Sequence, residues 1–438
     1  MYCQELLSIY LIKLMDWIDL LSPNIYYVSR MNSSKEKLAI LSLQYYSYPD
    51  AVGGAWNLTH EINKRLVERG HRVVIITCKP DDKYPDQEEI NGVEFDRVSF
   101  AVSKDPIRLW NAIRRKVKHH LREEESWVAH VHHPLVGAFA LTTKCYRQIP
   151  KIYHFHSSWY DEEKINLTET DQDKINRYFR LKIIRWLEWV CYRYSKSILF
   201  LSEYTRKRFI DYFPFKKPRM RIIPGGADTT KFYPSENINE LNAIRNQLGI
   251  PVEHKFLLTV RRLEARMGLD KLITAIAEIV NRNPELKFKL VIAGKGSLND
   301  KLKSQATLSG LDDHIHFCGF VPDNLLPGYY AAADIFILPT TFIEGFGIAT
   351  VEALSSGLPV FGTPVGGTTE ILESIDKKLL FRDADAKSMA EKIEWFLKNP
   401  DPIFSLKSKC REEALQKYSW DLVTDRFEEE LDLVWKSK

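Results

Sequence analysis

Short apolar runs alternate with longer segments of helical character along almost the whole chain. In the first half, β-branched and other apolar residues form runs at residues 38–43, 73–77, 127–131, 152–156 and 197–202. The second half repeats this pattern at residues 255–260, 287–294, 315–320, 334–339 and 358–362. Strands that alternate with helices form parallel sheets covered on both faces. The pattern therefore predicts an α/β protein with two doubly wound, Rossmann-like domains.

The length of the chain and one loop-like stretch locate the domains. A chain of 438 residues exceeds the usual size of a single hydrophobic core, and a cleft between two domains is a common ligand site. The stretch "PGGADTTKFYP" at residues 224–234 clusters glycine and proline as linkers do. Near the C-terminus, apolar residues recur at helical spacing. We expect an N-terminal extension at residues 1–36, domains at 37–225 and 226–419 that face each other across a cleft, and a final helix at 420–438.

Composition narrows the class of protein. Apolar residues make up 45% and charged residues 27%, as in ordinary globular proteins. A formal net charge of +4 is too balanced for a nucleic-acid binder. The six cysteines lie far apart without a C-x-x-C pair, which argues against a zinc-finger site and against a disulfide framework. These features predict a globular protein with reduced cysteines.

The N-terminal stretch does not resemble a membrane span or a signal peptide. Its apolar residues are interrupted by Lys13, Asp16 and Asp19, and no run reaches the roughly 18 residues that a span requires. We expect a cytoplasmic protein, in which the sequons at Asn57 and Asn166 stay unmodified. Residues 1–30 are either an added amphipathic helix or codons upstream of a true start at Met31.

Two glutamates bracket a glycine-rich turn after one predicted strand. Glu344 precedes the turn, and Glu352 follows it on the helix expected to begin near Ile348. A helix N-terminus offers free amide groups and a partial positive charge, which suit a phosphate. Carboxylates on either side can accept hydrogen bonds from hydroxyl groups. The arrangement predicts a site for a nucleotide sugar, with one carboxylate on the ribose hydroxyls and the other on the sugar hydroxyls.

Several motifs resemble those of the retaining GT-B glycosyltransferases known as family 4. They are "PDAVGGAWNLTHEINKRL", "HFHSSW", "RIIPGGADTTKFYP", "VRRLEARMGLDKLITA", "VIAGKGS" and "FIEGFGIATVEALSSGLPVFGTPVGG". The resemblance covers nearly the whole chain from Leu38 onward. It implies an acceptor-side first domain, a donor-binding second domain and a final helix that crosses back to the first domain.

The resemblance also implies site residues. By position in the motifs, the catalytic residues are His156, Gly54 and Glu344, and the donor-binding residues are Gly53, Gly54, Arg262, Arg266, Gly294, Glu344, Gly345, Phe346, Gly347, Ile348 and Glu352. Two positions depart from the family pattern: Gly225 replaces an asparagine, and Met267 replaces a lysine that neutralises the diphosphate. We expect Arg266 to take over from that lysine, because a guanidinium binds phosphate through two hydrogen bonds.

Five histidines lie at the ends of two predicted strands. They are His130, His132, His133, His154 and His156. Clustered histidines can bind a metal, but no carboxylate accompanies them at ligand spacing, and we expect no metal and no other cofactor. Except for His156, we expect these side chains to have structural roles.

The segment Arg108 to Leu121 predicts a basic amphipathic helix. Its apolar residues recur every four positions, and arginine and lysine occupy much of the remainder. Such a helix either packs on its own sheet or lies on an anionic membrane surface, here at the inner face of the membrane.

These observations predict a retaining hexosyltransferase that uses a nucleotide-diphosphate sugar and requires no metal. No carboxylate in the first half is a convincing nucleophile, Asp50 being the nearest to the glycine loop. This absence suits front-face displacement, in which the leaving phosphate takes the acceptor's proton. A nucleotide-sugar epimerase and a catalytically silent nucleotide-sugar binder remain alternatives. A dinucleotide dehydrogenase is less consistent, because no G-x-G-x-x-G follows the first strand. The nucleotide base, the sugar, the acceptor (lipid, saccharide or small molecule) and the oligomeric state stay open.

Overall fold

The computed structural model describes residues 36–437, apart from residues 52, 123–125, 171–173 and 214–217. The predicted N-terminal extension therefore lies outside the described residues, except for its last position. The described chain divides into two compact units. The first contains the residues up to Leu201, Thr205–Ile223 and the chain from Thr424 onward; the second contains Ser202–Tyr204 and Pro224–Val423. The chain passes from the first unit to the second between Ile223 and Pro224, where the expected linker begins.

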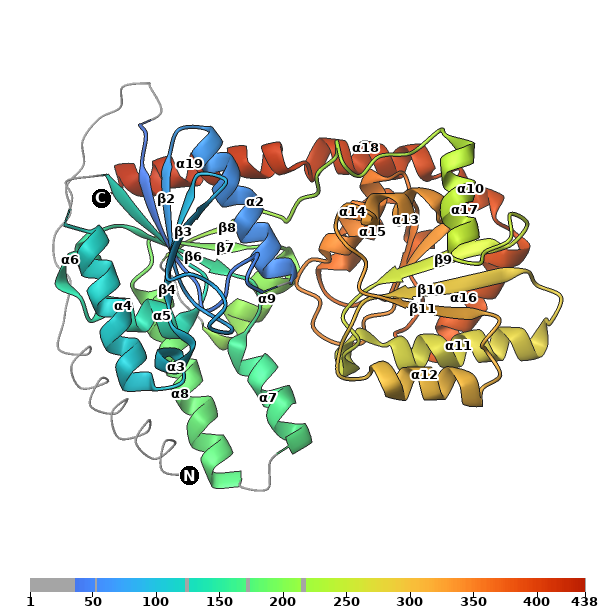
Figure 1. The fold of residues 1–438 in the computed structure, drawn as a ribbon, viewed down its shortest axis with the longest axis horizontal. Coiled ribbons are helices and arrows are strands. Elements are labelled where there is room, and N and C mark those ends of the chain that lie inside the picture. The colour runs from blue at the N-terminus through green and yellow to red at the C-terminus, as the bar shows by residue number, and fades with distance from the viewer. Residues whose placement is uncertain (1–35, 52, 123–125, 171–173, 214–217, 438) are drawn as a thin grey trace. The chain divides into compact units, whose positions relative to one another are not determined.

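The sheet of the first unit has eight strands in the order β3-β4-β2-β1-β5-β6-β7-β8 (Figure 1). Neighbouring strands are parallel except β3 and β4. The sequence pattern predicts five of these strands and misses β3, β4 and β8, in which charged residues interrupt the apolar pattern. The strands are β1 (Ala39–Leu43), β2 (Arg72–Cys78), β3 (Gln87–Ile90), β4 (Val93–Val98), β5 (Trp127–Val131), β6 (Lys151–Phe155), β7 (Ser197–Phe200) and β8 (Arg219–Ile222).

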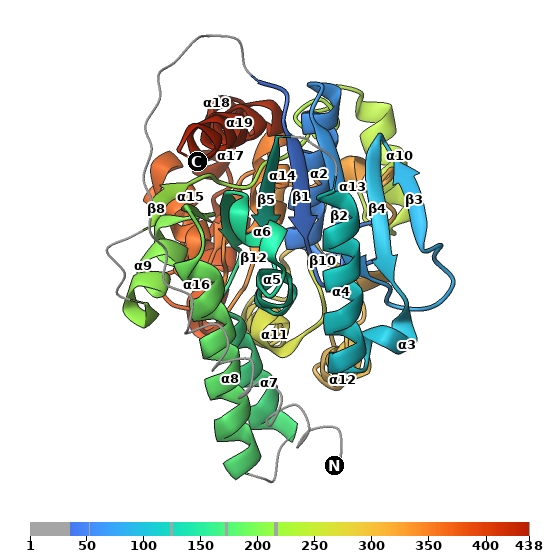
Figure 2. The ribbon, with the colours of Figure 1, turned by 90° about the vertical axis from the view of Figure 1, so that its left-hand side faces the viewer.

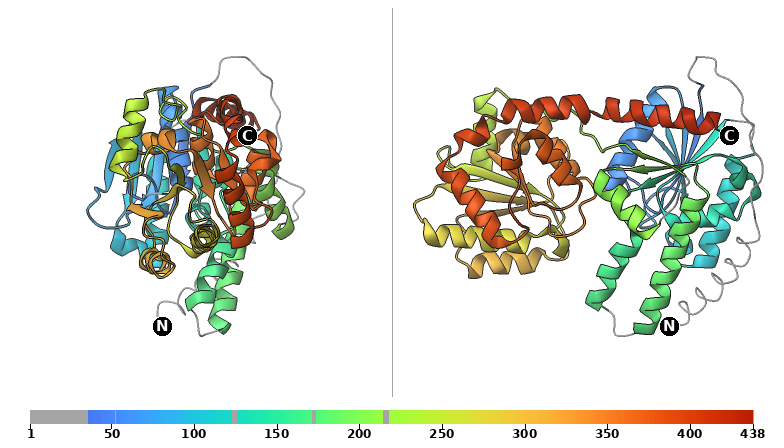
Figure 3. Two further views of the ribbon diagram at one scale, coloured as in Figure 1. Left: turned by 90° about the vertical axis from the view of Figure 1, so that its right-hand side faces the viewer. Right: turned by 180° about the vertical axis from the view of Figure 1, so that it is seen from behind.

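Helices cover both faces of this sheet. On one face, α2 and α19 contact strand β5: Thr59 of α2 reaches His132, and Phe427 of α19 packs against His130. On the other face, α4, α5 and α8 pack side by side on the apolar core (Figure 2). Helices α7 and α8 form a hairpin (Figure 3). The helices are α2 (Gly54–Glu68), α3 (Phe100–Ser103), α4 (Pro106–His120), α5 (Pro134–Leu141), α6 (Lys144–Gln148), α7 (Trp159–Thr170), α8 (Lys174–Arg193), α9 (Glu203–Tyr212) and α19 (Trp420–Lys436).

Helix α4 is the predicted basic amphipathic helix. Its apolar residues Leu109, Ile113 and Val117 are fully buried in the core of the first unit. The apolar face therefore packs on its own sheet, which is one of the two alternatives that the sequence leaves open, and it has no area to offer a bilayer. Side chains that are already buried against the sheet are removed from water by folding, so contact with a bilayer would bring them no further hydrophobic stabilisation. Only the exposed cations of α4 remain available for membrane contact.

Two buried carboxylates attach helix α19 to the first unit. Glu428 lies 3.0 Å from the Nε2 atom of His71, whose Nδ1 atom accepts the backbone N–H of Leu38. Glu430 accepts a hydrogen bond of 2.7 Å from the Ser197 hydroxyl and pairs with Arg219 and Arg221. These charged hydrogen bonds, together with the buried Phe427 and Leu431, make the end of the chain part of the first unit.

The sheet of the second unit has five parallel strands in the order β11-β10-β9-β12-β13 (Figure 1). All five coincide with predicted runs to within two residues. The strands are β9 (Lys255–Val260), β10 (Phe288–Ala293), β11 (Ile315–Gly319), β12 (Ile335–Leu338) and β13 (Val360–Gly362). The helices are α10 (Ile238–Gln247), η1 (Ala265–Met267), α11 (Leu269–Arg282), α12 (Asn299–Leu308), α13 (Leu326–Ala332), α14 (Ile348–Ser355), α15 (Gly367–Ile375), η2 (Lys377–Leu379), α16 (Ala386–Lys398), α17 (Asp401–Phe404) and α18 (Lys407–Lys417).

The structure also bears on two sequence expectations, one about membrane-spanning helices and one about the cysteines. Within the described residues, no helix is both long enough and apolar enough to cross a membrane. The described cysteines are free thiols, and Cys78, Cys191 and Cys410 are buried.

Neighbouring glutamates of α19 provide a test of its attachment. We expect Glu430→Ala to lower the free energy of unfolding by roughly 2 kcal/mol, because a buried charged hydrogen-bond acceptor is lost and Ser197 is left with its longer contact, 3.4 Å, to the Arg219 carbonyl. Glu429→Ala is the matched control: its side chain is 57% exposed and pairs only with Arg221, so the loss should stay below about 1 kcal/mol. Urea denaturation followed by circular dichroism measures both. Equal losses in the two variants would contradict the assigned role of Glu430.

Candidate active site

The predicted donor site forms at the carboxyl edge of the second sheet. Strands β9 and β12 are parallel neighbours, so the loops that follow them start side by side. Arg261 comes directly after β9, and Thr340 and Glu344 come after β12. Ligands of open parallel sheets bind at this edge. The topology therefore brings together residues that are about 80 positions apart in the sequence.

An ion pair between Arg261 and Glu344 is the centre of this site. The Nη2 atom of Arg261 donates to the Oε2 atom of Glu344 at 2.7 Å, and its Nη1 atom donates to the Thr340 hydroxyl at 2.5 Å. The Thr340 hydroxyl in turn lies 3.1 Å from the same carboxylate oxygen. Burial alone would raise the pKa of Glu344, but the neighbouring Arg261 guanidinium outweighs it and holds this pKa below its usual value. Glu344 is therefore ionised at neutral pH.

Arg261 also contacts the residue that replaces the family's lysine. Its guanidinium lies 3.0 Å from the Sδ atom of Met267, a buried side chain. Arg261 thus places a positive charge beside Met267. Arg266, which we expect from the sequence to take over from the missing lysine, donates through its Nη1 atom to the backbone carbonyl of Ile343 at 2.6 Å. Arg262, the other predicted phosphate ligand, is exposed.

The loop that carries Glu344 is tightly held. Ile343 has a φ of 45°, a left-handed conformation that costs a β-branched residue free energy and occurs where the surrounding structure enforces it. Arg266 binds its carbonyl, and the backbone N–H of Gly367 donates to the carbonyl of Glu344 at 2.9 Å. A Cβ atom on Gly366, whose φ is 71°, would lie 2.0 Å from that carbonyl oxygen. Glycine is required there for the two loops to meet.

Helix α14 begins directly after this loop, as predicted. Gly347 is its N-cap, with a φ of 94°, and Ile348 is its first residue. The predicted ligand segment Gly345–Ile348 therefore lies at a helix N-terminus, where free N–H groups attract anions. The Phe346 side chain is buried and packs against Tyr418, so this residue can offer a ligand only its backbone. The predicted Gly294 has a φ of 142° and packs against the Arg261 carbonyl, so it positions Arg261.

Glu352 lies on α14 and hydrogen-bonds a buried tyrosine. The hydroxyl of Tyr330 donates to its Oε2 atom at 2.9 Å. Burial raises the pKa of Glu352 to about 7, although the Tyr330 hydrogen bond and the Lys231 charge act in the opposite direction. The two glutamates of the motif thus differ: Glu344 is ionised at neutral pH, whereas Glu352 titrates near it. Carboxylates with separated pKa values are typical of functional sites.

The predicted residues of the first unit lie at the carboxyl ends of its strands. Gly53 is the N-cap of α2, and Gly54 is its first residue. His156 follows β6, and its Nε2 atom lies 3.0 Å from the Nδ1 atom of His132. Burial lowers the pKa of His156 to about 4, so its ring is neutral at physiological pH. A neutral imidazole can donate or accept one hydrogen bond but contributes no charge.

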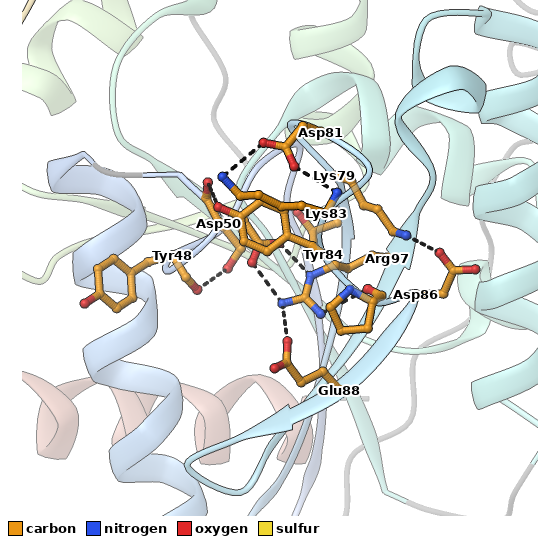
Figure 4. Close-up of polar contacts among 12 residues, drawn as sticks. Tyr48, Asp50, Lys79, Asp81, Lys83, Tyr84, Asp86, Glu88 and Arg97 are labelled. Atoms are coloured by element: carbon orange, nitrogen blue, oxygen red, sulfur yellow. Dashed lines mark hydrogen bonds and ion pairs between the residues drawn. The ribbon is translucent and has the colours of Figure 1, made fainter.

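Asp50 is not free to act as a nucleophile. Its carboxylate receives two hydrogen bonds from Arg97, at 2.6 and 2.9 Å, and neither side chain is exposed (Figure 4). Glu88 pairs with the same guanidinium, and the Tyr84 hydroxyl donates to the Asp50 backbone carbonyl (Figure 4). A carboxylate engaged in a buried bidentate pair is a structural element.

Sequence reasoning missed Arg261, Thr340 and Tyr330. Adjacent residues at the end of a strand point to opposite sides, so Arg261 and Arg262 cannot both face the site. The sequence did contain a signal for Arg261, because it directly precedes the predicted ligand Arg262 at the end of the same strand. Thr340 and Tyr330 carry no motif of their own.

Comparisons with known proteins agree with this architecture. Residues 52–231 match the family model Glycosyltransferase Family 4, and residues 241–417 match the model Glycosyl transferases group 1. The solved structure of sucrose-phosphate synthase from Thermosynechococcus elongatus superposes with a TM-score of 0.75 at 19% identity, covering 92% of this chain and 100% of that one. The fold and the two matches define a GT-B glycosyltransferase. The chain belongs to the glycosyl transferases group 1, together with the family 4 N-terminal domain, and is an enzyme.

Two further relatives give the range of similarity. An uncharacterized glycosyltransferase of Methanocaldococcus jannaschii is 25% identical over 389 residues, which are 88% of this chain and 95% of that protein. The structure of Anabaena HepE, solved in complex with UDP-glucose, has a TM-score of 0.70 at 18% identity and covers 90% of this chain and 100% of that one.

The raised pKa of Glu352 predicts how pH affects stability. An acid whose pKa rises from 4.5 to about 7 on folding binds more protons when folded, so its contribution to stability falls as pH increases between these values. Glu352→Gln removes this titration. Relative to wild type, the variant should gain roughly 3 kcal/mol of unfolding free energy between pH 4.5 and pH 7.5. Urea denaturation at a series of pH values measures the difference, and a difference independent of pH would contradict the burial of this carboxyl.

Proposed function

We propose that this enzyme is a retaining glycosyltransferase that transfers a hexose from a nucleotide-diphosphate sugar to an acceptor hydroxyl. The observation that carries the proposal is the Arg261 guanidinium, held between Glu344, Thr340 and Met267 at the edge of the sheet where α14 begins. This places a fixed positive charge next to free helix amides. A diphosphate matches both groups in charge and geometry.

Arg261 and the amides of α14 would stabilise the leaving group. When the bond from the anomeric carbon to the phosphate oxygen breaks, negative charge accumulates on the nucleoside diphosphate. Preorganised positive groups at that position lower the barrier, and removing one such group typically costs a factor of about 10² to 10³ in rate. Charge neutralisation by protein groups fits our expectation that the diphosphate binds without a metal.

The two glutamates would hold hydroxyl groups of the donor. Glu344 is ionised and has acceptor capacity beyond its bonds to Arg261 and Thr340, which suits sugar hydroxyls. Glu352 would accept hydrogen bonds from the ribose, which favour its ionised form. Because its pKa is about 7 without ligand, binding of the donor should be accompanied by release of a proton near neutral pH.

Front-face displacement accounts for retention without a carboxylate nucleophile. Asp50 is engaged by Arg97, and His156 is a neutral imidazole. The acceptor oxygen would attack the anomeric carbon from the side of the leaving phosphate, whose oxygen takes the acceptor's proton as the old bond breaks. In this scheme His156 contributes a hydrogen bond near the reacting sugar, as implied by its motif. The structure of HepE was solved in complex with UDP-glucose, which supports a nucleotide sugar as the donor class for this enzyme. Its acceptor would be a lipid, a saccharide or a small molecule.

Nucleotide-dependent stabilisation tests the donor site. With UDP, GDP, ADP, dTDP and CDP in separate samples, we expect one nucleotide at about 100 times its dissociation constant to add roughly 2.7 kcal/mol, a rise of about 2 °C or more in the melting temperature. Glu352→Ala should lose most of the shift because the ribose loses its acceptor. Arg261→Met should lose it because the diphosphate loses its charge, whereas exposed Lys301→Gln should retain it.

Product analysis separates the proposed transfer from the alternatives. An epimerase would convert the nucleotide sugar without any acceptor, and a silent binder would show the shift without turnover. If no nucleotide shifts the midpoint even at millimolar concentration, Arg261 does not replace the missing lysine and the proposal fails.

We also propose that the first unit contacts anionic membranes by charge. Helix α4 exposes Arg115 and Lys118, and α8 exposes Tyr178 and Phe179, each 55% exposed. Helix α5 packs against both α4 and α8, so these groups belong to neighbouring elements (Figure 2). Exposed cations suit the anionic headgroups of a bilayer, and exposed aromatic rings suit its interface.

Sedimentation with lipid vesicles tests this contact. Each cation near an anionic surface contributes about 1 kcal/mol, so Arg115→Gln with Lys118→Gln should weaken binding to phosphatidylglycerol vesicles roughly 30-fold. The pair Lys301→Gln and Lys303→Gln on α12, also exposed, is the control and should have no effect. Equal binding to neutral phosphatidylcholine vesicles would contradict a contact based on charge.

A further inference from the structure

Four histidines from two neighbouring strands meet inside the first unit. His130 lies on β5 and His154 on β6, and His132 and His156 follow two residues later on each strand. Side chains two positions apart in a strand share a face, and β5 and β6 are parallel neighbours. All four rings therefore lie on the face that α2 and α19 cover.

The ring nitrogens are close enough to share one ion. The Nε2 atom of His130 lies 3.3 Å from the Nδ1 atom of His154. One ring nitrogen from each of His130, His132 and His154 lies within 4.8 Å of the others. Zinc binds histidine nitrogens at 2.0–2.1 Å in a tetrahedral arrangement, which places the ligand nitrogens about 3.4 Å apart. The three nitrogens therefore lie at most about 1.4 Å farther apart than the ligands of a bound zinc ion.

The protein leaves these rings incompletely satisfied. The Nδ1 atoms of His130 and His156 and the Nε2 atoms of His132 and His154 are buried and have no hydrogen-bond partner among the described residues. Buried polar atoms without a partner are rare in native proteins, and an ion or ordered water often explains them. By contrast, the neighbouring His133 has a clear structural role, because its Nδ1 atom accepts the N–H of Leu135 and caps α5.

Neighbouring side chains enclose the cluster on its inner side. Phe427 packs on His130, and the Thr59 hydroxyl lies 3.4 Å from the Nδ1 atom of His132. His130 and His154 are buried, whereas His132 and His156 are partly exposed at the strand ends. An ion would thus have its protein ligands inside and an approach from the carboxyl edge of the sheet.

We propose that His130, His132 and His154 bind a Zn²⁺ ion, with the fourth coordination position facing His156. Three neutral imidazoles suffice for zinc, as carbonic anhydrase demonstrates, so a carboxylate ligand is not required. This proposal replaces our expectation from the sequence that no metal binds the chain. It lies in the first unit, next to His156, and its ligands are not part of the donor site in the second unit.

Metal analysis of the untagged, full-length protein tests the proposal. Loaded with one equivalent of Zn²⁺ and dialysed, the wild type should retain close to one zinc per chain by mass spectrometry. His130→Gln and His154→Gln should lose most of it, because each removes a buried ligand while keeping a polar side chain of similar size. His119→Gln, an exposed histidine of α4, is the matched control and should bind zinc like the wild type.

A second measurement needs no variant. Co²⁺ in place of Zn²⁺ should give the visible absorption bands of a tetrahedral site with nitrogen ligands, and a chelator should remove the bands and lower the melting temperature of the loaded protein. Zinc retention in His130→Gln and His154→Gln equal to the control, or a wild type that retains no zinc and shows no tetrahedral cobalt spectrum, would overturn the proposal. Nucleotide-induced stabilisation, measured in the same variants, should stay unchanged and so separates this result from the donor site.

Discussion

The ion pair between Arg261 and Glu344 is the interaction on which the donor site depends. It joins the loops after two adjacent strands and compensates both charges in a partly buried position. Removing either partner would leave the other charge desolvated, which is costly in protein interiors. The same pair keeps Glu344 ionised and fixes the position of the guanidinium. One contact therefore sets the position of the two loops and the ionised state of Glu344.

Much of the surrounding structure serves to hold this pair in place. Gly294 lets β10 approach the Arg261 backbone, Gly366 lets the loop after β13 approach the Glu344 backbone, and Arg266 binds the carbonyl of Ile343. These contacts reduce the freedom of the two charged side chains before any donor arrives, which is the condition for electrostatic stabilisation of a transition state.

The sequence predicted the α/β class and the buried strands because uninterrupted apolar runs such as residues 127–131 and 255–260 have few alternatives to a covered parallel sheet. It missed β3 and β8, which are exposed edge strands whose residues follow no apolar pattern. Within the site, Glu344, Gly347 and Glu352 were recognisable by spacing. Arg261 and Tyr330 were not, because the direction of a strand-end side chain and a contact between helices α13 and α14 depend on tertiary packing. The histidine cluster was visible as residues, but its convergence required the register of β5 and β6.

Helix α19 has a consequence for how the protein is made. The chain builds most of the first unit, then all of the second, and only then supplies Phe427, Glu428 and Glu430, which the first unit buries. Domains generally fold as they leave the ribosome, starting from the N-terminus. Here the first unit to be synthesised is the last to be completed. Until its final residues emerge, His71 and Ser197 lack their carboxylate partners, and α2 covers one face of the sheet without α19. The nascent protein must therefore keep an apolar surface out of contact with other chains while some 200 further residues are translated.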